Sequence, residues 1–357
     1  MGIRFEYGAR KATNGPMIFF SDPVAEVNLQ EEIRGAIGSR LCFYAYRMPG
    51  DMMVSFGSSE GYVDGIGVPG FVIAPFLPDQ LPITIPYAPS RRIETGETYP
   101  FPTGSTSREE YCAEVEAIRR FIDGDGAKKV VAARVKVEND SADVASTFLN
   151  LTRAYPDAYV FCFSTPKTGC WIGATPELLL HRHGALYHTM ALAGTRPADN
   201  QLPWDEKNIR EQEMVTRYIL RALREAGLQP EALPTVSRRA GRIEHLCTPI
   251  EASGNAPSAQ LLARLSPTPA TAGVPRQEAL SLIAEYENFH RAYYGGYCGP
   301  FRSENDFDLC VILRCARVEA ERYALFAGGG ITSASVADNE WEETEMKLST
   351  LGRHLEF

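Results

Sequence analysis

The order of the expected strands and helices is the feature that most constrains the fold of this chain. Beyond Ser107, strand-like segments follow one another in groups that single helices interrupt. The expected strands are 130–137, 158–163, 171–172, 178–181, 242–248, 308–318 and 323–327, and the expected helices are 108–123, 205–226, 258–265, 276–286 and 340–351. A regular alternation of strand and helix would predict a parallel sheet, whereas this order is typical of an α+β fold.

The first part of the chain is expected to contribute strands. Residues 1–86 contain short strand-like runs separated by glycine and proline turns. Residues 79–106 are rich in Pro, Thr, Ser and Gly, which indicates a long surface connection. Ser107 and Glu110 then have the spacing of a capping box, which predicts the start of the helix at 108–123.

Charge and composition exclude several kinds of partner. The chain of 357 residues carries a formal net charge of -9, which argues against nucleic acid or an anionic membrane. No apolar run reaches the roughly 20 residues that cross a bilayer, and residues 1–10 lack the basic-then-apolar order of a secretory signal. Eight cysteines without a C-x-x-C pair and six histidines without ligand spacing indicate free thiols rather than a zinc site. We therefore expect a protein of the reducing cytoplasm.

The expected C-terminal helix carries charged residues at helical spacing. Glu340, Glu343 and Lys347 share one side of this helix. The adjacent apolar stripe consists of Trp341, Thr344, Leu348 and Leu351. Two carboxylates beside a glycine-rich turn at 328–330 suit a Mg²⁺ site that also holds an anionic substrate. The alternative is an exposed helix with Glu–Lys pairs.

Lys129 and Glu177 are candidates for proton transfer. Strand alternation places Lys129 at the end of an apolar strand face, where loss of solvation favours loss of its proton, as a general base requires. The alternative is a strand-end lysine that reaches out to water. Glu177 directly precedes a run of leucines, and an apolar setting raises the pKa of a carboxyl to the range of a proton donor near neutrality. The alternative for Glu177 is an edge glutamate that faces solvent.

Glu211 and Arg314 are candidates for binding a cation and an anion. Glu211 lies on the apolar stripe of the helix at 205–226, so it needs a partner, either a metal cation or an arginine. Arg314 lies within the expected apolar strand at 308–318. Together with the bare backbone of the glycines at 328–330 it would form a carboxylate clamp, although these glycines could equally mark a tight turn.

Two other glycine-containing segments bear on ligand binding. Gly194 and Thr195 offer a close backbone approach, followed by Arg196 as a possible anion donor. The glycines at 328–330 lack a G-x-G-x-x-G context, which argues against a dinucleotide-binding fold.

A series of motifs resembles those of the chorismate-utilising enzymes, the family of isochorismate, anthranilate, salicylate and aminodeoxychorismate synthases. In order they are Lys129-Val-Val, Gly173-Ala-Thr-Pro-Glu177, Ala191-Leu-Ala-Gly-Thr-Arg-Pro, Lys207-Asn-Ile-Arg-Glu211, Leu265-Ser-Pro-Thr-Pro-Ala-Thr-Ala-Gly273, Arg291-Ala-Tyr-Tyr-Gly-Gly, Leu313-Arg-Cys-Ala-Arg317, and Ala327-Gly-Gly-Gly-Ile with Glu340-Trp-Glu-Glu343 and Lys347. The resemblance covers about residues 107–353, which would form the catalytic region. Residues 1–106 match loosely and resemble a shortened, β-rich N-terminal part of the same fold.

This resemblance implies a fold and an activity. The fold would be a large mixed α/β sandwich of the anthranilate synthase component I type, with two pseudo-halves around one core. The activity would be that of an isochorismate synthase, an isomerase (hydroxymutase) that needs no redox cofactor. In that family the lysine matching Lys129 activates water for attack at C2 of chorismate, and the glutamate matching Glu177 protonates the C4 hydroxyl as it leaves.

The resemblance also implies the binding residues. Carboxylates matching Glu211 and Glu343 would bind Mg²⁺, with Glu340 in or near that shell. The substrate-binding positions would be Arg314 and the backbone around Gly328 for the enolpyruvyl carboxylate, Lys347 with the Gly194–Thr195 turn to complete the pocket, and Ala270, Tyr294 and Phe326 in its wall.

Three positions and one N-terminal signature separate the subfamilies, and a fourth position departs from many members of the family. Lysine-bearing aminodeoxychorismate synthases have their lysine where this chain has Ala193, and salicylate synthases typically place threonine at the position of Ala270. Anthranilate synthases usually differ at the position of Lys129 and carry an N-terminal Leu-Leu-Glu-Ser signature, which this chain lacks. Many members read His-Pro-Thr-Pro where this chain has Ser266-Pro-Thr-Pro, a difference that concerns the positioning of substrate rather than the acid or the base.

We therefore expect chorismate as substrate, isochorismate as product and Mg²⁺ as cofactor, in menaquinone or siderophore biosynthesis. The protein is expected to act as a monomer, without an obligatory glutaminase subunit. A salicylate synthase that goes on to eliminate pyruvate is the first alternative, and an ammonia-using anthranilate or aminodeoxychorismate synthase subunit is the second. A non-catalytic chorismate-binding or scaffold protein is the alternative from a different class, and the presence of acid, base and metal-binding candidates argues against it.

Overall fold

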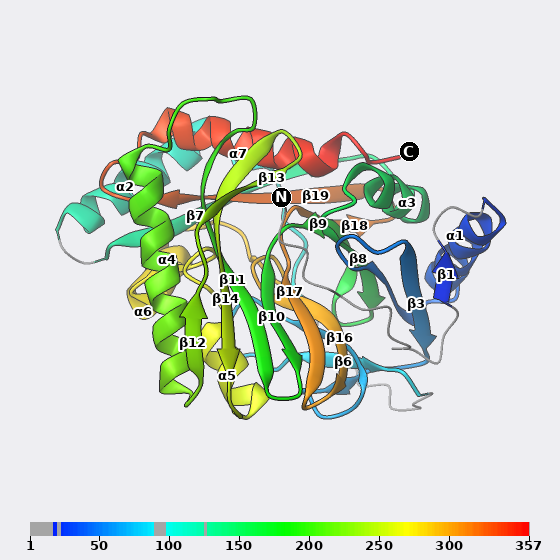
Figure 1. The fold of residues 1–357 in the computed structure, drawn as a ribbon. Helices are drawn as coiled ribbons and strands as arrows, with labels where there is room; N and C mark the ends of the chain where they lie inside the picture. The colour runs from blue at the N-terminus through cyan, green and yellow to red at the C-terminus, as the bar shows by residue number, and fades with distance from the viewer. Residues whose placement is uncertain (1–16, 20–22, 89–97, 125–126, 357) are drawn as a thin grey trace.

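Two large antiparallel sheets dominate the computed structural model, which describes residues 17–19, 23–88, 98–124 and 127–356 (Figure 1). The first sheet has the order β1 (Met17–Phe19), β3 (Met53–Ser59), β2 (Cys42–Arg47), β8 (Tyr159–Thr165), β9 (Gly169–Thr175), β18 (Cys315–Glu319), β19 (Arg322–Ile331), β7 (Lys129–Glu138) and β15 (Gly273–Val274). The second has the order β12 (Gln229–Ala232), β14 (Ile243–Ser253), β11 (Leu186–Pro197), β10 (Leu178–His183), β17 (Asp306–Val311), β16 (Tyr297–Ser303), β5 (Gly70–Ala74), β6 (Ile83–Pro86) and β4 (Val63–Asp64), with β13 (Val236–Ala240) paired to β14.

The inner faces of the two sheets form one apolar core. Tyr44 of the first sheet stacks on Phe71 of the second, with ring centroids 4.9 Å apart. Trp171 and Phe326 of the first sheet belong to the same buried cluster as Met190 of the second. A sandwich of antiparallel sheets around a shared core confirms the α+β fold expected from the sequence.

Helices cover the outer faces of both sheets. Among the described residues they are α1 (Pro23–Gly38), α2 (Arg108–Asp123), α3 (Val144–Ala154), α4 (Glu206–Glu225), α5 (Ser258–Leu265), α6 (Arg276–Tyr286) and α7 (Ala337–Gly352). Apolar side chains of α1, α3 and α7 pack on the first sheet, those of α4 and α5 pack on the second, and α2 and α6 pack beside β7. Within the described residues, no helix is both long and apolar enough to cross a membrane.

Several elements begin and end close to their predicted bounds. Helix α2 starts with the predicted capping box, because the Ser107 hydroxyl accepts from the Glu110 N–H over 3.1 Å and the Glu110 carboxylate accepts from the Ser107 N–H over 2.7 Å. The predictions for α4, α5 and α6 are also confirmed. All eight cysteines are free, and six of them are buried.

The expectation of strands alone in residues 1–86 was wrong. Helix α1 lies within this segment, and its buried residues Leu29, Ile33 and Ala36 recur at helical spacing. Strand β6 likewise interrupts the surface connection expected at 79–106. Residues 1–16 and 89–97, which include the segment judged against a secretory signal and part of that connection, lie outside the described residues.

Two further corrections concern segments that form the site. The strand expected at 308–318 is broken at 312–314, where the chain leaves β17 in the second sheet and enters β18 in the first. Gly328, Gly329 and Gly330 do not form a turn, because they are the last part of β19 and pair with β7. Their role must therefore come from the missing side chains rather than from a turn conformation.

The N-terminal part joins both sheets. Strands β2 and β3 pair in the first sheet next to β8, and β5 pairs with β16 in the second. The described strands before residue 107 therefore belong to the same sandwich as the rest of the described chain. The boundary at 106 and 107 stays a prediction.

Candidate active site

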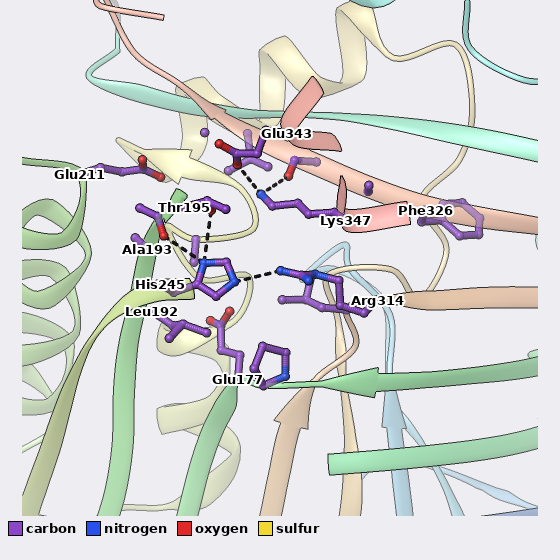
Figure 2. Close-up of a pocket in the computed structure, with 18 of the residues that line it drawn as sticks. Glu177, Leu192, Ala193, Thr195, Glu211, His245, Arg314, Phe326, Glu343 and Lys347 are labelled. Carbon is purple, nitrogen blue, oxygen red and sulfur yellow. Dashed lines mark hydrogen bonds and ion pairs between the residues drawn. The ribbon is translucent and has the colours of Figure 1, made fainter. Parts of the chain in front are cut away.

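A pocket lies between the two sheets and gathers residues that are distant in the sequence (Figure 2). The predicted residues that line it are Lys129, Glu177, Gly194, Thr195, Glu211, Ala270, Tyr294, Arg314, Phe326, Gly328, Glu343 and Lys347. The structure adds His245, which no motif had indicated. Glu340 is the predicted site residue that does not line this pocket.

The chain passes from one sheet to the other at two places beside this pocket. Glu177 lies between β9 of the first sheet and β10 of the second, and Arg314 lies between β17 and β18. The two passages are hydrogen-bonded to each other, since the Ala174 N–H donates to the Arg314 carbonyl over 3.2 Å and the Val311 N–H donates to the Glu177 carbonyl over 3.0 Å. The sandwich topology thus places a carboxyl and a guanidinium next to each other.

Glu177 is a buried carboxyl surrounded by positive charge. Its burial raises its pKa to about 7, and the charges of Lys129, Arg314 and Lys347 oppose this rise. The Thr268 hydroxyl donates to Glu177 Oε1 over 3.5 Å, which also favours the carboxylate form. The predicted burial and raised pKa are confirmed, but the surroundings are cationic rather than apolar. A carboxyl with this pKa can give a proton near neutral pH.

Arg314 is a buried cation without a carboxylate partner among the described residues. Its backbone has a φ of 48°, an uncommon conformation for a residue other than glycine, and this directs the chain between the sheets. Its Nη2 contacts His245 Nε2 at 3.0 Å, and its Nη1 donates to Thr350 Oγ1 over 3.4 Å. Because a buried charge is costly unless it is paired, this guanidinium suits an anion bound in the pocket.

His245 orients Arg314, and sequence analysis missed it. Its Nδ1 lies 2.9 Å from the Gly194 carbonyl, which can only accept, so Nδ1 carries the hydrogen and Nε2 accepts from Arg314. Burial and the charge of Arg314 lower the pKa of His245 well below its usual value, which keeps the ring neutral. The available signal was a lone histidine inside the apolar strand predicted at 242–248.

Lys129 and Glu211 form a buried ion pair. Lys129 Nζ lies 2.8 Å from Glu211 Oε1, and the exposed fractions of the two side chains are 1% and 10%. The burial of Lys129 is confirmed, and the partner of Glu211 on its apolar stripe is a lysine rather than an arginine. Gly330 makes room for this pair, because a Cβ there would lie 2.4 Å from Glu211 Oε1 and 2.8 Å from Lys129 Cε.

Glu343 and Lys347 form a second ion pair at the pocket. Lys347 Nζ donates to Glu343 Oε1 over 2.6 Å and to the Gly328 carbonyl over 2.8 Å. Burial opposes the charge of Glu343, but Lys347, Lys207 and a hydrogen bond from Thr195 together hold the pKa of this carboxyl below its usual value. The Glu–Lys pair foreseen for an exposed helix therefore exists, but it is mostly buried and faces the pocket.

Glu340 lies behind the pocket and is held by Lys207. The two side chains form an ion pair at 2.5 Å, and Glu340 is 2% exposed. A Cβ at Gly329 would lie 3.1 Å from Glu340 Oε2, so the glycine admits this carboxylate. Burial opposes the charge of Lys207, yet Glu340, Glu211 and Glu343 together raise its pKa. Three carboxylates therefore act on one ammonium group at this end of the pocket.

The carboxylates that line the pocket suit a magnesium ion that would be bound through few protein ligands. Among the described residues, no group of three His, Cys, Asp or Glu side chains could hold a metal by itself. Glu211 and Glu343 nevertheless both line the pocket, and the bare backbone at Gly330 gives the Glu211 carboxylate its place. Mg²⁺ is commonly bound through one or two carboxylates, with substrate and water as the remaining ligands.

The remaining sequence-derived positions are divided between the pocket and its surroundings. Tyr294 and Phe326 stack with ring centroids 5.6 Å apart and form part of the wall, as the resemblance implied. The turn predicted at Gly194 and Thr195 was wrong, because both residues lie within β11 at a bulge in its pairing with β14. Asn208 holds this bulge, since its Oδ1 accepts from the Thr195 N–H over 3.0 Å. Ser266 is buried but does not line the pocket.

A comparison with protein-family models identifies the family. The model described as "Chorismate binding enzyme" matches residues 89–356. The chain belongs to the chorismate-binding enzyme family. The match covers the region from β7 to α7 that supplies every pocket residue described above.

Curated relatives of this chorismate-binding enzyme include isochorismate synthases. It is 35% identical over 243 residues to the isochorismate synthase EntC of Escherichia coli K12, which covers 62% of this chain and 61% of the relative. It is 34% identical over 254 residues to the putative isochorismate synthase MenF of Mycobacterium tuberculosis, covering 64% of this chain and 68% of the relative. The chain thus spans about three fifths of the length of the EntC relative.

Solved structures share the fold. The putative 2,3-dihydroxybenzoate-specific isochorismate synthase DhbC from Bacillus anthracis aligns with a TM-score of 0.77 and 22% identity, over 91% of this chain and 99% of that one. The menaquinone-specific isochorismate synthase MenF from E. coli aligns with a TM-score of 0.72 and 22% identity, over 88% and 89%. Anthranilate synthase component I from Streptococcus pneumoniae aligns with a TM-score of 0.61 and 21% identity, over 74% and 62%.

Proposed function

We propose that this chorismate-binding enzyme is an isochorismate synthase, an isomerase that moves a hydroxyl group from C4 to C2 of chorismate by exchange with water. The observation that carries the proposal is one pocket that holds a buried lysine, Lys129, a buried carboxyl with a pKa of about 7, Glu177, and a buried guanidinium, Arg314, that pairs with no carboxylate of the described residues. These are a proton acceptor, a proton donor and an anion site for a dianionic substrate.

Lys129 is proposed as the general base. Its Nζ would take a proton from a water molecule as that water adds to C2 of the ring. The side chain is fixed by its contact with Glu211 and by the lack of a side chain at Gly330. Once Nζ has taken this proton, the ammonium lies against the Glu211 carboxylate.

Glu177 is proposed as the general acid. Its carboxyl would give a proton to the C4 hydroxyl, which leaves as water while the ring double bonds shift. The reaction then balances, since one water adds at C2 and one water leaves from C4. Burial supplies the raised pKa that keeps this carboxyl protonated up to about pH 7.

The remaining pocket groups bind the two carboxylates of the substrate. Arg314, held by His245, would bind the enolpyruvyl carboxylate together with the backbone near Gly328 and the ammonium of Lys347. Glu211 and Glu343 would hold Mg²⁺, which when bound neutralises the ring carboxylate. Lys129 and Lys347 pair with these two carboxylates and hold them in place.

The alternatives within the family differ in their products. A salicylate synthase would also release pyruvate, and the small side chain of Ala270 in the pocket wall argues against it, because that subfamily was expected to carry threonine there. The similar structures named above include a putative 2,3-dihydroxybenzoate-specific and a menaquinone-specific isochorismate synthase, and the proposed chemistry is the same for both. We propose that the chain acts as a monomer without a glutaminase subunit.

Product analysis tests the proposal. Purified protein is incubated with chorismate and Mg²⁺, with and without ammonium, and the products are separated by chromatography. Isochorismate without salicylate, pyruvate or an aminated product is expected. Salicylate with an equal amount of pyruvate would instead indicate a salicylate synthase, and turnover that needs ammonium would indicate an anthranilate or aminodeoxychorismate synthase subunit.

A further inference from the structure

The outer edge of β7, the strand that begins with Lys129, is completed by side chains. Strand β15 pairs with β7 at Lys129 and Val130, and the Val131 N–H donates to the Ala272 carbonyl over 2.7 Å. Farther along, the Thr106 N–H donates to the Val135 carbonyl over 2.9 Å. Between these two segments no described strand covers β7, and its edge groups must find other partners.

Glu287 and Arg291 fill this gap. Glu287 Oε1 accepts from the Ala133 N–H over 3.0 Å, and Arg291 Nη2 donates to the Val131 carbonyl over 2.7 Å. The two side chains are ion-paired, with Arg291 Nε at 2.7 Å from Glu287 Oε2, and each is 2% exposed. The pair thus supplies the acceptor and the donor that a peptide group of a neighbouring strand would supply.

Arg291 also binds the loop at 268–271. Its Nη1 donates to the Thr271 carbonyl over 2.7 Å. The Thr271 N–H donates to the Thr268 carbonyl over 3.0 Å, and Thr268 is the residue whose hydroxyl donates to Glu177. One guanidinium therefore connects the strand of Lys129 with the loop that touches Glu177.

We propose that the Glu287–Arg291 pair is a positioning device that holds the proposed base and the proposed acid in register across the substrate. This inference rests on the proposed function and adds two residues that do not line the pocket. Arg291 fits this task because its planar fork donates to three acceptors at once, which a lysine cannot do in the same geometry. An isolated buried pair in the core would show no such link to both proton-transferring groups.

The positioning role predicts a change in the pH profile. The Thr268 hydroxyl lowers the pKa of Glu177, as do the charges of Lys129, Arg314 and Lys347. The thiols of Cys247 and Cys310 also lie near enough to sense the Glu177 charge. If the loop at 268–271 loosens, Glu177 loses the Thr268 hydrogen bond while the other groups remain. Its pKa then rises, and the alkaline limb of kcat, which reports the loss of the acidic proton, moves to higher pH.

Arg291→Lys and Thr268→Val test this role in the isochorismate assay. For Arg291→Lys we expect kcat to fall roughly tenfold to hundredfold while KM for chorismate changes less than about threefold, because the anion-binding groups are untouched. Both variants should shift the alkaline limb of kcat upward. Thr268→Val leaves the Arg291 contacts in place, so it gives a reading even if Arg291→Lys does not fold.

Arg182→Lys is the matched control. Arg182 is also buried, and it donates to Asn255 Oδ1 over 2.7 Å and to the Ala256 carbonyl over 3.0 Å, away from the pocket. This substitution should lower Tm without shifting the alkaline limb of kcat. The positioning role would be overturned if Arg291→Lys had a lower Tm but kept the wild-type kcat and the wild-type alkaline limb of kcat. It would also be overturned if the alkaline limb of Thr268→Val did not shift. Wild-type protein that forms no isochorismate would refute the proposed function instead.

Discussion

Glu177 and Glu114 are both buried glutamates, but their surroundings differ. Burial raises the pKa of Glu177 to about 7 and that of Glu114 to about 8. Glu177 lines the pocket and is acted on by the charges of Lys129, Arg314 and Lys347. Glu114 lies on α2 outside the pocket lining, where the nearby charge of Glu287 raises its pKa further. Its Oε1 finds no hydrogen-bond partner within the part of the chain that the structure describes.

The comparison shows what a raised pKa does and does not indicate. Both carboxyls hold a proton near neutral pH because water is excluded from them. Only Glu177 combines this with a space for a ligand and with cations that can bind an anionic one. A perturbed pKa therefore supports a catalytic role at Glu177 and a structural cost at Glu114.

The largest expected difference is in turnover. Glu177→Gln should lower kcat for isochorismate formation by about a thousandfold, because the amide cannot give a proton to the leaving hydroxyl. Glu114→Gln should leave kcat within about twofold, since Glu114 does not line the pocket. Steady-state assays of the two variants side by side check this. Similar losses in both would contradict the separation of roles.

Arg314 should affect substrate binding more than chemistry. Arg314→Met removes the guanidinium that has no carboxylate partner among the described residues, and KM for chorismate should rise roughly tenfold to hundredfold. His245→Ala should give a smaller rise, because it disturbs the orientation of Arg314 and leaves its charge in place. Because Glu177→Gln should turn over chorismate very slowly, calorimetry of chorismate binding to this variant gives the reference affinity. An unchanged KM in Arg314→Met would refute the anion site.

The proposed magnesium ligands should affect metal affinity. Glu343→Gln should weaken Mg²⁺ binding about tenfold, measured by titration calorimetry in the presence of chorismate. Glu342→Gln on the same helix is the control, because Glu342 is 60% exposed and pairs only weakly with Arg108 at 3.4 Å. Equal Mg²⁺ affinity in wild type and Glu343→Gln would remove Glu343 from the metal site.

Glu114 should contribute to the pH dependence of the free energy of unfolding. Its folded-state pKa of about 8 lies above the ordinary value of 4.5, so the folded protein holds this proton more tightly than the unfolded chain does. The stabilisation is complete below about pH 4.5 and is lost as pH rises to about 8. Glu114→Gln should therefore show a flatter decline of unfolding free energy over this range, by a few kcal/mol at most. Parallel curves in urea unfolding would contradict the assignment.

Local patterns predicted much of the fold and most of the residues of the site. The capping box at Ser107 predicted α2, an apolar run predicted β7, and an apolar stripe at helical spacing predicted α4. The motifs correctly predicted that Lys129 and Glu177 line one pocket. These features depend on neighbours in sequence or on recurring motifs.

The rest depends on contacts between distant segments. The break of the strand at 312–314 follows from the passage of the chain between sheets, which apolar content alone does not reveal. The pairing of Glu211 with Lys129 joins α4 to β7, and His245 gains its role only through Arg314. Glu340, spaced like a pocket residue on its helix, is turned to Lys207 instead.

Label transfer from solvent tests the central claim most directly. Wild-type protein is incubated with chorismate and Mg²⁺ in water enriched in heavy oxygen, and the isochorismate formed is examined by mass spectrometry. If Lys129 activates a water molecule while Glu177 expels the C4 hydroxyl, the product carries one solvent oxygen at C2. Isochorismate that retains only the original oxygen would show that the hydroxyl migrates without water, and the assignment of base and acid across the ring would be wrong.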